Sequence, residues 1–136
     1  MNTDFVTLNK TNTGIASEFL VAGELARRGY NVTLTLGNTK SIDLLIEKNN
    51  KLIPIQVKGI QRIKSLCWNI NLSKLENANM IYALVNLNAD TLGSPEYFVL
   101  TENEVKTLFK PTKSGRDYLD YNPAKKLNLE NRWDKI

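Results

Sequence analysis

The stretch Ser41-Ile-Asp-Leu-Leu-Ile-Glu-Lys-Asn-Asn-Lys-Leu-Ile-Pro-Ile-Gln-Val-Lys58 carries the strongest fold signal in the chain. Two aliphatic, β-branched runs, residues 42–47 and 52–58, flank the polar segment Lys48-Asn-Asn-Lys51. Asn tolerates positive φ, so Asn49 and Asn50 predict a two-residue type I′ turn. The segment is therefore expected to form an antiparallel hairpin.

The predicted register gives the hairpin one apolar and one polar face. It places Asp43 opposite Gln56, with Lys58 two residues further along the same face. The other face carries Ile42, Leu44, Ile46, Ile53, Ile55 and Val57. Pro54 is the weak point, because it removes a ladder donor. Burying such polar groups without partners costs several kcal/mol each, so we expect them to have a function.

A helix is predicted upstream, over residues 14–28. Thr13 suits the N-cap, and Gly29 suits the position after the C-cap. The stripe predicted to face the core is Ile15, Phe19, Ala22, Leu25 and Ala26. Glu18 lies on this stripe and is expected to point inward, whereas Glu24 lies off it.

The remaining sequence predicts further strands over 32–36, 66–72, 80–87 and 96–100. Capping-box patterns at 73–76 and 101–104 predict two short helices, the second ending near Phe109. Residues 110–136 are expected to form loops and short turns. Trp68, Tyr82 and Trp133 are expected in the core. Together these elements predict a single α/β domain over residues 1–136, built on a mixed sheet.

Composition excludes several kinds of chemistry. The chain has 136 residues, no His and one Cys. It therefore lacks a Ser-His or Cys-His nucleophile pair and a His- or thiolate-based zinc site. A metal would need oxygen ligands, which suits Mg²⁺ or Mn²⁺. No apolar run is long enough for a membrane span, and we expect a cytoplasmic protein.

The net charge is +4, and its distribution is uneven. Residues 48–74 contain six basic side chains and no Asp or Glu: Lys48, Lys51, Lys58, Arg62, Lys64 and Lys74. Such a block attracts phosphate, although charge bias taken alone more often marks a solvated face. Candidate nucleic-acid contacts are Lys40, Arg62 and Lys64.

Two carboxylates, an amide and an amine next to a basic surface suit phosphodiester cleavage, in which a cation neutralises the phosphate. Asp43 would be the central metal ligand, and Gln56 would offer its carbonyl oxygen. Lys58 would hold the attacking water or stabilise charge on the phosphorane. Glu18 would bind the metal through water or orient a ligand.

The order of Glu in a helix, Asp in a strand and Glu-x-Lys in the next strand resembles the PD-(D/E)XK, or restriction-endonuclease-like, nucleases. Gly14-Ile-Ala-Ser-Glu18 and Gly29-Tyr-Asn-Val32 are similar to archaeal Holliday-junction resolvases and uncharacterised bacterial relatives. The resemblance covers about residues 14–59. It implies an αβββαβ core, a Mg²⁺- or Mn²⁺-dependent endonuclease acting on DNA rather than RNA, and a homodimer. Gln56 departs from the pattern, because an acidic residue usually stands there.

Each of these four residues also has a purely structural interpretation. Glu18 would form an ion pair with Lys40 or Lys58, Asp43 would form an Asx turn, and Lys58 would simply pair with Asp43. Gln56 would be a cross-strand amide. The alternative function is a non-catalytic module that binds nucleic acid or protein, with Gln56 marking a decayed metal site. A small interaction protein is a third possibility, with no residue pattern in its favour.

Overall fold

The computed structural model describes residues 8–35, 42–61, 67–70, 79–89, 91, 93–109 and 117–136. In chain order its elements are α1 (Lys10–Arg27), β1 (Asn31–Leu34), β2 (Leu44–Lys48), β3 (Lys51–Ile60), β4 (Cys67–Ile70), β5 (Ile81–Asn86), β6 (Glu96–Thr101), α2 (Glu102–Leu108), β7 (Asp117–Asp120), α3 (Tyr121–Lys126) and the 3₁₀ helix η3 (Trp133–Lys135). Five strands form a sheet in the order β1-β2-β3-β5-β6, and β4 pairs with β7 separately. Only the β3–β5 pair of the large sheet is parallel, so the sheet is mixed, as predicted.

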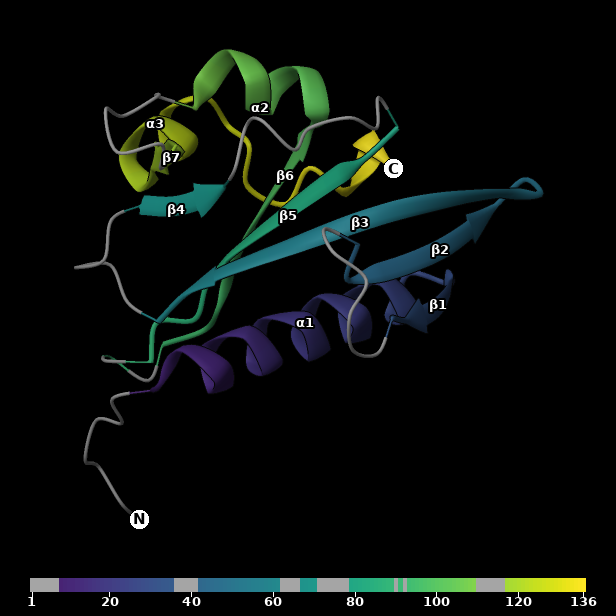
Figure 1. Ribbon diagram of the computed structural model, residues 1–136, viewed down its shortest axis with the longest axis horizontal. Helices are drawn as coiled ribbons and strands as arrows, with labels where there is room; N and C mark the ends of the chain where they lie inside the picture. Colours follow the sequence, from purple (N-terminus) through teal and green to yellow (C-terminus); the bar gives the residue numbers. More distant parts are fainter. Residues whose placement is uncertain are drawn as a thin grey trace.

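Each face of the large sheet has its own apolar core (Figure 1). Helix α1 covers one face, where Val21 and Leu25 pack with Leu44, Ile46 and Ile55. Helices α2 and α3 and the β4–β7 pair cover the other face. The predicted apolar face of the hairpin is present and meets α1, except at Ile42, which was predicted on this face but packs against the other core.

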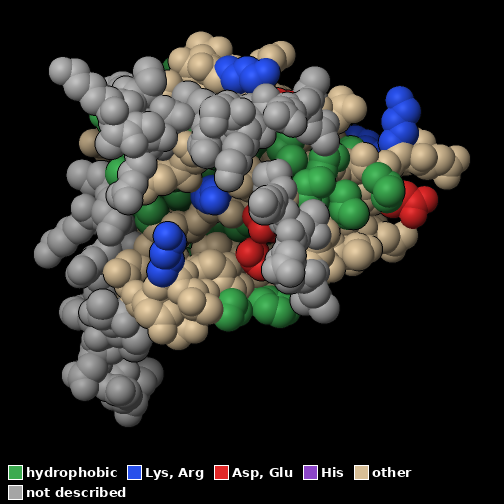
Figure 2. All heavy atoms as spheres, in the orientation of Figure 1, with side chains coloured by type: hydrophobic (Ala, Val, Ile, Leu, Met, Phe, Trp, Pro, Cys, Tyr) green, Lys and Arg blue, Asp and Glu red, His purple; other side chains and the backbone are tan. Residues whose placement is uncertain are grey.

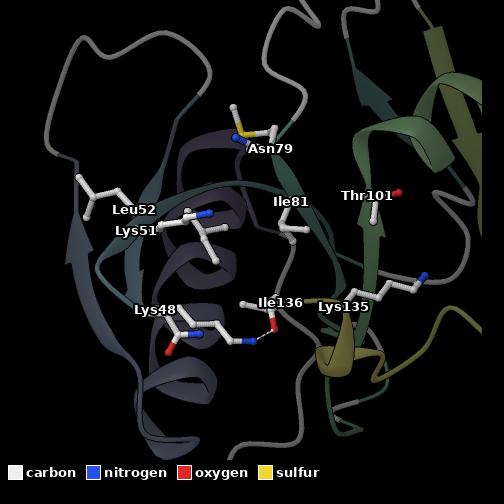
Figure 3. A pocket seen from close by; sticks show the side chains of 11 residues that line it. Lys48, Lys51, Leu52, Asn79, Ile81, Thr101, Lys135 and Ile136 are labelled. Carbon is white, nitrogen blue, oxygen red and sulfur yellow. Dashed lines mark hydrogen bonds between the residues drawn. The ribbon is translucent and has the colours of Figure 1, made fainter.

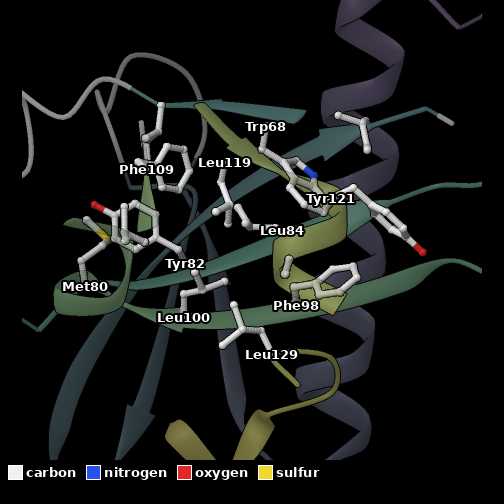
Figure 4. Packing of buried hydrophobic residues seen from close by; sticks show 14 residues of the cluster. Trp68, Met80, Tyr82, Leu84, Phe98, Leu100, Phe109, Leu119, Tyr121 and Leu129 are labelled. Atoms are coloured by element: carbon white, nitrogen blue, oxygen red, sulfur yellow. The ribbon is translucent and has the colours of Figure 1, made fainter. Parts of the chain in front are cut away.

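The second core is built around aromatic side chains (Figure 4). The Trp68 ring lies 5.3 Å from that of Phe98, and Trp68 Nε1 donates a hydrogen bond to the Val85 carbonyl at 3.0 Å. Tyr82 is 2% exposed, and Trp133, in the core on the α1 side, is 4% exposed. The prediction that the two tryptophans and Tyr82 are core residues is confirmed.

The predicted hairpin is present with its predicted register. Asn49 and Asn50 have φ angles of 52° and 62°, as a type I′ turn requires. Pairing runs from Lys48 opposite Lys51 to Leu44 opposite Ile55. Pro54 is tolerated because the pairing of β3 with β5 begins only at the next residue.

Helix α1 starts earlier than predicted. It begins at Lys10 rather than residue 14, because Asn9 is the N-cap and accepts a bond from the Asn12 N–H. The Thr13 hydroxyl donates to the Asn9 carbonyl from within the first turn, so Thr13 is not the cap. At the other end Gly29, with φ of 95°, closes a Schellman motif, as predicted.

The core-facing side of α1 was predicted wrongly. Its buried residues are Ser17, Val21 and Leu25, spaced four apart. Ile15 and Phe19, predicted to face the core, are 49% and 60% exposed. The helix has two apolar stripes that share Leu25, and periodicity alone does not show which one the sheet covers.

The other boundaries moved for identifiable reasons. The strand predicted to begin at Ile42 begins at Leu44, and the strand predicted over 66–72 is β4, outside the large sheet. The capping box at Thr101 is present, whereas the one predicted over 73–76 lies outside the described residues. Residues 110–136 were predicted as loops and turns but contain β7, α3 and η3. These elements are too short to show a period and depend on tertiary partners, such as β4 for β7. None of the described helices is both long and apolar enough to span a bilayer.

Candidate active site

Within the described part of the chain, one edge of β3 has no partner strand next to the polar hairpin residues. The β2 pairing ends at Ile55, whereas pairing with β5 on the other edge continues to Ile60. Gln56 and Lys58 lie on the part of β3 that pairs with β5 but not with β2. Gln56 is 9% exposed, and Lys58 is half-buried.

Asp43 occupies the free edge. It lies just before β2, and its backbone N–H donates to the Ile55 carbonyl at 3.0 Å. Its Oδ2 accepts a hydrogen bond from the Val57 N–H at 2.8 Å. The carboxylate therefore replaces the strand carbonyl that β2 would otherwise supply. The prediction that Asp43 lies directly opposite Gln56 is wrong. Asp43 instead bonds to Ile55 and Val57, the residues on either side of Gln56.

The backbone of Asp43 is held from the opposite side as well. The Asp43 carbonyl accepts hydrogen bonds from the Thr35 N–H at 3.1 Å and from the Thr35 hydroxyl at 3.0 Å. The residue is thus fixed between β3 and the end of β1. This network also explains why β2 begins late, since residue 43 bonds through its side chain instead of continuing the ladder.

Glu18 reaches the same place from α1. Burial raises the pKa of the Glu18 carboxyl above its ordinary value. The negative charge of Asp43 and a hydrogen bond with its side chain raise this pKa further, while Lys58 opposes the shift. Two carboxylates held this close favour a cation between them or a shared proton.

The four predicted residues share one cleft of about 710 Å³, lined by Glu18, Asp43, Gln56 and Lys58. Groups from both sheet faces meet there because β2 no longer covers the edge of β3. Figure 2 views this face, on which acidic and basic side chains meet near the centre, between the sheet and α1. Among the described residues Asp43 and Lys58 form no ion pair with each other, so the simple structural interpretation of the two is not met.

The donor atoms in the cleft suit a hard divalent cation. Two carboxylates and an amide carbonyl offer only oxygen, as Mg²⁺ and Mn²⁺ prefer. Within the described part of the chain no three His, Cys, Asp or Glu side chains cluster as a metal site would require. A cation here would therefore keep several waters, which is usual for Mg²⁺ in nuclease-type sites.

Some site residues were missed, and some predicted ones are not described. Lys10, at the start of α1, and Asn69, on β4, also line the cleft. Asn69 had no signal in the sequence, because only the tertiary fold brings β4 to this edge. Lys10 lay before the predicted helix start. The predicted nucleic-acid contacts Lys40, Arg62 and Lys64 fall outside the described residues.

A second pocket, of about 450 Å³, lies near the hairpin turn (Figure 3). It is lined by Lys48, Lys51 and Lys135 among others, and none of its lining residues in the described part of the chain is Asp or Glu. Lys48 Nζ donates to the backbone oxygen of Ile136 across it. Its described side chains therefore do not offer the carboxylates that line the cleft around Asp43.

Sequence comparison finds no family model and no curated protein that matches the chain. Solved structures do match. Hjc, a Holliday junction resolvase from the archaeal hyperthermophile Archaeoglobus fulgidus, aligns with a TM-score of 0.60 over 87% of this chain and 91% of its own. The bacterial homing endonuclease I-Ssp6803I aligns with a TM-score of 0.54 over 71% of this chain and 68% of its own. Each is 16% identical to this chain.

The chain has the restriction-endonuclease-like fold. At this identity the likeness concerns the fold, and the resemblance noted in the sequence is confirmed at that level. The four residues singled out in the sequence, Glu18, Asp43, Gln56 and Lys58, line one cleft of this fold.

Proposed function

We propose that the protein is a metal-dependent nuclease that hydrolyses phosphodiester bonds in DNA. One observation carries the proposal: Glu18, Asp43, Gln56 and Lys58 come from three separate elements or their ends and line the same cleft. The structural neighbours, an endonuclease and a Holliday junction resolvase, support the reaction class and a DNA substrate.

Each side chain has a distinct role in this proposal. The Asp43 oxygen not bonded to Val57, the Glu18 carboxylate and the Gln56 carbonyl would hold Mg²⁺ or Mn²⁺. When bound, the ion supplies Lewis-acid stabilisation of the phosphate and a more acidic water. The Lys58 ammonium donates hydrogen bonds to a phosphate oxygen or the attacking water, and it stabilises negative charge as the phosphorane forms.

The Asp43–Val57 hydrogen bond gives the site its rigidity. A metal ligand held by the backbone of the neighbouring strand keeps its orientation without reorganisation. Glu18 approaches from a long helix, and Gln56 and Lys58 sit on a strand that is paired along its other edge. The reacting groups are thus placed on rigid elements.

Cleavage assays test the proposal directly. Purified protein with Mg²⁺ or Mn²⁺ should cut linear duplex, single-stranded or four-way-junction DNA, and EDTA should stop the reaction. Lys58→Ala should lower the rate at least roughly 100-fold, by loss of charge stabilisation in the transition state. Lys126→Ala, on the exposed surface of α3, serves as the control and should behave as wild type. Undiminished cleavage by Lys58→Ala would refute the mechanism.

We further propose that the active species is a homodimer, since cutting both strands of a duplex at one place requires two such clefts. Light scattering with and without duplex DNA tests this proposal. A monomer in both conditions, together with double-strand cleavage, would contradict it.

A non-catalytic binding module remains the second candidate because of one observation. Gln56 stands where the fold's motif has an acid, so the cleft offers two carboxylates among the described residues. A Mn²⁺ titration separates the candidates. No binding at millimolar Mn²⁺, salt-sensitive DNA binding, and a gain of metal affinity in Gln56→Glu would together favour the module.

A further inference from the structure

Helix α1 passes close to β3 where Ser17 lies over Gly59. Ser17 is fully buried. A Cβ placed on Gly59 would lie 1.9 Å from Ser17 Oγ, 2.9 Å from Ser17 Cβ and 3.3 Å from the Thr13 carbonyl oxygen. The first two distances are shorter than Cβ contacts found in proteins. The Ser17 hydroxyl can rotate aside, but the Ser17 Cβ is fixed to the helix backbone, so a side chain at position 59 must move α1 away from β3.

This contact lies next to the proposed active site in both sequence and space. Ser17 precedes Glu18, and Gly59 follows Lys58. The Ser17 hydroxyl donates to the Thr13 carbonyl of its own helix at 2.7 Å. The Ser17 hydroxyl thus bonds within its own helix, and the small size of Ser17 and Gly59 is what allows the two residues to lie so close together.

The two glycines within α1 itself show that the need for a glycine is specific to position 59 on β3. A Cβ at Gly14 or Gly23 would meet nothing within 4 Å. Of Gly14, Gly23 and Gly59, Gly59 is the one at which the packing of α1 on the sheet requires the absence of a side chain. The rest of the α1 contact, through Val21 and Leu25, uses ordinary apolar side chains.

We propose that Ser17 and Gly59 are positioning residues that set how deeply Glu18 enters the cleft beside Asp43 and Lys58. Restoring ordinary contact at 3.4 Å for the Ser17 Cβ, from 2.9 Å, requires α1 to shift by about 0.5 Å. A misplacement of about 1 Å at a reacting group costs roughly 100-fold in rate, so half that distance should cost roughly 10-fold. The expected loss of DNA cleavage rests on the proposed function, whereas the effect of Ser17 and Gly59 on the position of α1 does not.

The test is Gly59→Ala, compared with Gly23→Ala. In Gly59→Ala, DNA cleavage should fall roughly 10-fold and Mn²⁺ should bind roughly 10-fold more weakly, as for lost outer-shell support. Nuclear Overhauser contacts between α1 and β3 should weaken, while those within the large sheet persist. Gly23→Ala adds the same methyl to open space and should leave rate, Mn²⁺ affinity and contacts unchanged.

A compensating substitution sharpens the test. In the Gly59→Ala background, Ser17→Gly removes both close atoms and leaves only the Thr13 oxygen at 3.3 Å, so it should restore most of the lost signals. Ser17→Ala leaves the Cβ at 2.9 Å and should restore less. Should Gly59→Ala not fold, Ser17→Thr adds one methyl to the same contact and takes its place.

Wild-type α1–β3 contacts in Gly59→Ala, or no restoration by Ser17→Gly in a folded double variant, would overturn the inference. Wild-type protein that neither binds Mn²⁺ nor cuts DNA would overturn the proposed function instead. The Overhauser contacts would still decide whether Ser17 and Gly59 set the position of α1.

Discussion

At the scale of single residues, the Asp43 carboxylate serves both the sheet and the cleft. Its Oδ2 accepts the Val57 N–H, which has no β2 carbonyl to bond with. The other oxygen is left for the cleft. Asp43 therefore has a structural role in the sheet and, in the proposed function, a metal-binding role, and the two can be separated by substitution.

Asp43→Asn should retain the bond to Val57, because an amide oxygen also accepts a hydrogen bond, although more weakly than a carboxylate, but it loses the charge. We expect cleavage to fall at least roughly 100-fold, with unfolding free energy within about 0.5 kcal/mol of wild type. Asp43→Ala also orphans the Val57 N–H and should cost about 1–3 kcal/mol more. Urea unfolding and cleavage rates measure both; equal stability of the two variants would contradict the structural role.

Glu18 should make stability depend on pH. Because folding raises the pKa of Glu18, its contribution is fully present below the ordinary value of 4.5 and is lost as pH rises through the raised pKa. In EDTA, Glu18→Gln should therefore melt higher than wild type at pH 8, with the gain shrinking toward pH 4.

Glu24→Gln is the matched control on the same helix. A hydrogen bond from Arg27 lowers the pKa of Glu24, so neutralising it should not stabilise the protein at pH 8. A gain in melting temperature from Glu24→Gln, or none from Glu18→Gln, would contradict this account.

At the scale of elements, α1 shows where periodicity fails. The sheet covers the stripe that contains Ser17, Val21 and Leu25, and Ser17 lies against Gly59 there. Val21→Ala should cost about 2–3 kcal/mol, because Val21 is fully buried. Phe19→Ala should cost less than about 1 kcal/mol, because Phe19 is 60% exposed. Urea unfolding distinguishes them, and the reverse order would favour the stripe predicted from sequence.

A second element-scale device joins β5, β6 and α3. Burial alone would raise the pKa of Glu96, but hydrogen bonds from Lys125, Tyr121 and Asn86 lower it to about 2. The stability it contributes is present above 4.5 and is lost as pH falls through about 2. Glu96→Gln should cost on the order of 1 kcal/mol at pH 7 and almost nothing near pH 2, measured by urea unfolding. An equal cost at both pH values would contradict the charge-based account.

At the scale of the whole molecule, the cleft joins α1 to both strands of the hairpin, so a cation there should stabilise the fold. At tenfold excess over its Kd, Mn²⁺ should add about 1.4 kcal/mol, or roughly 5 °C in Tm for a chain of this size. Asp43→Asn should show little of this increase. An equal Tm rise in both proteins would place the Mn²⁺ elsewhere.

Local sequence was enough to specify the hairpin, its register and its polar positions. Asn49-Asn50 sets a tight turn, and a two-residue side-chain period then fixes which residues share a face. These effects act between neighbouring residues, so they can be predicted without the fold. They placed Gln56 and Lys58 correctly, and with the motif order they indicated the restriction-endonuclease-like fold.

Contacts between distant segments decided three features. They determine which stripe of α1 is buried, and they end the β2 pairing at the point where the Asp43 side chain bonds to Val57. They also bring Asn69 of β4 to the cleft. None of these features can be predicted from residues that are neighbours in the chain. Periodicity shows only that a helix face is apolar, whereas burial depends on which side chains fit against the sheet, and the close fit of Ser17 against Gly59 is a contact of this kind.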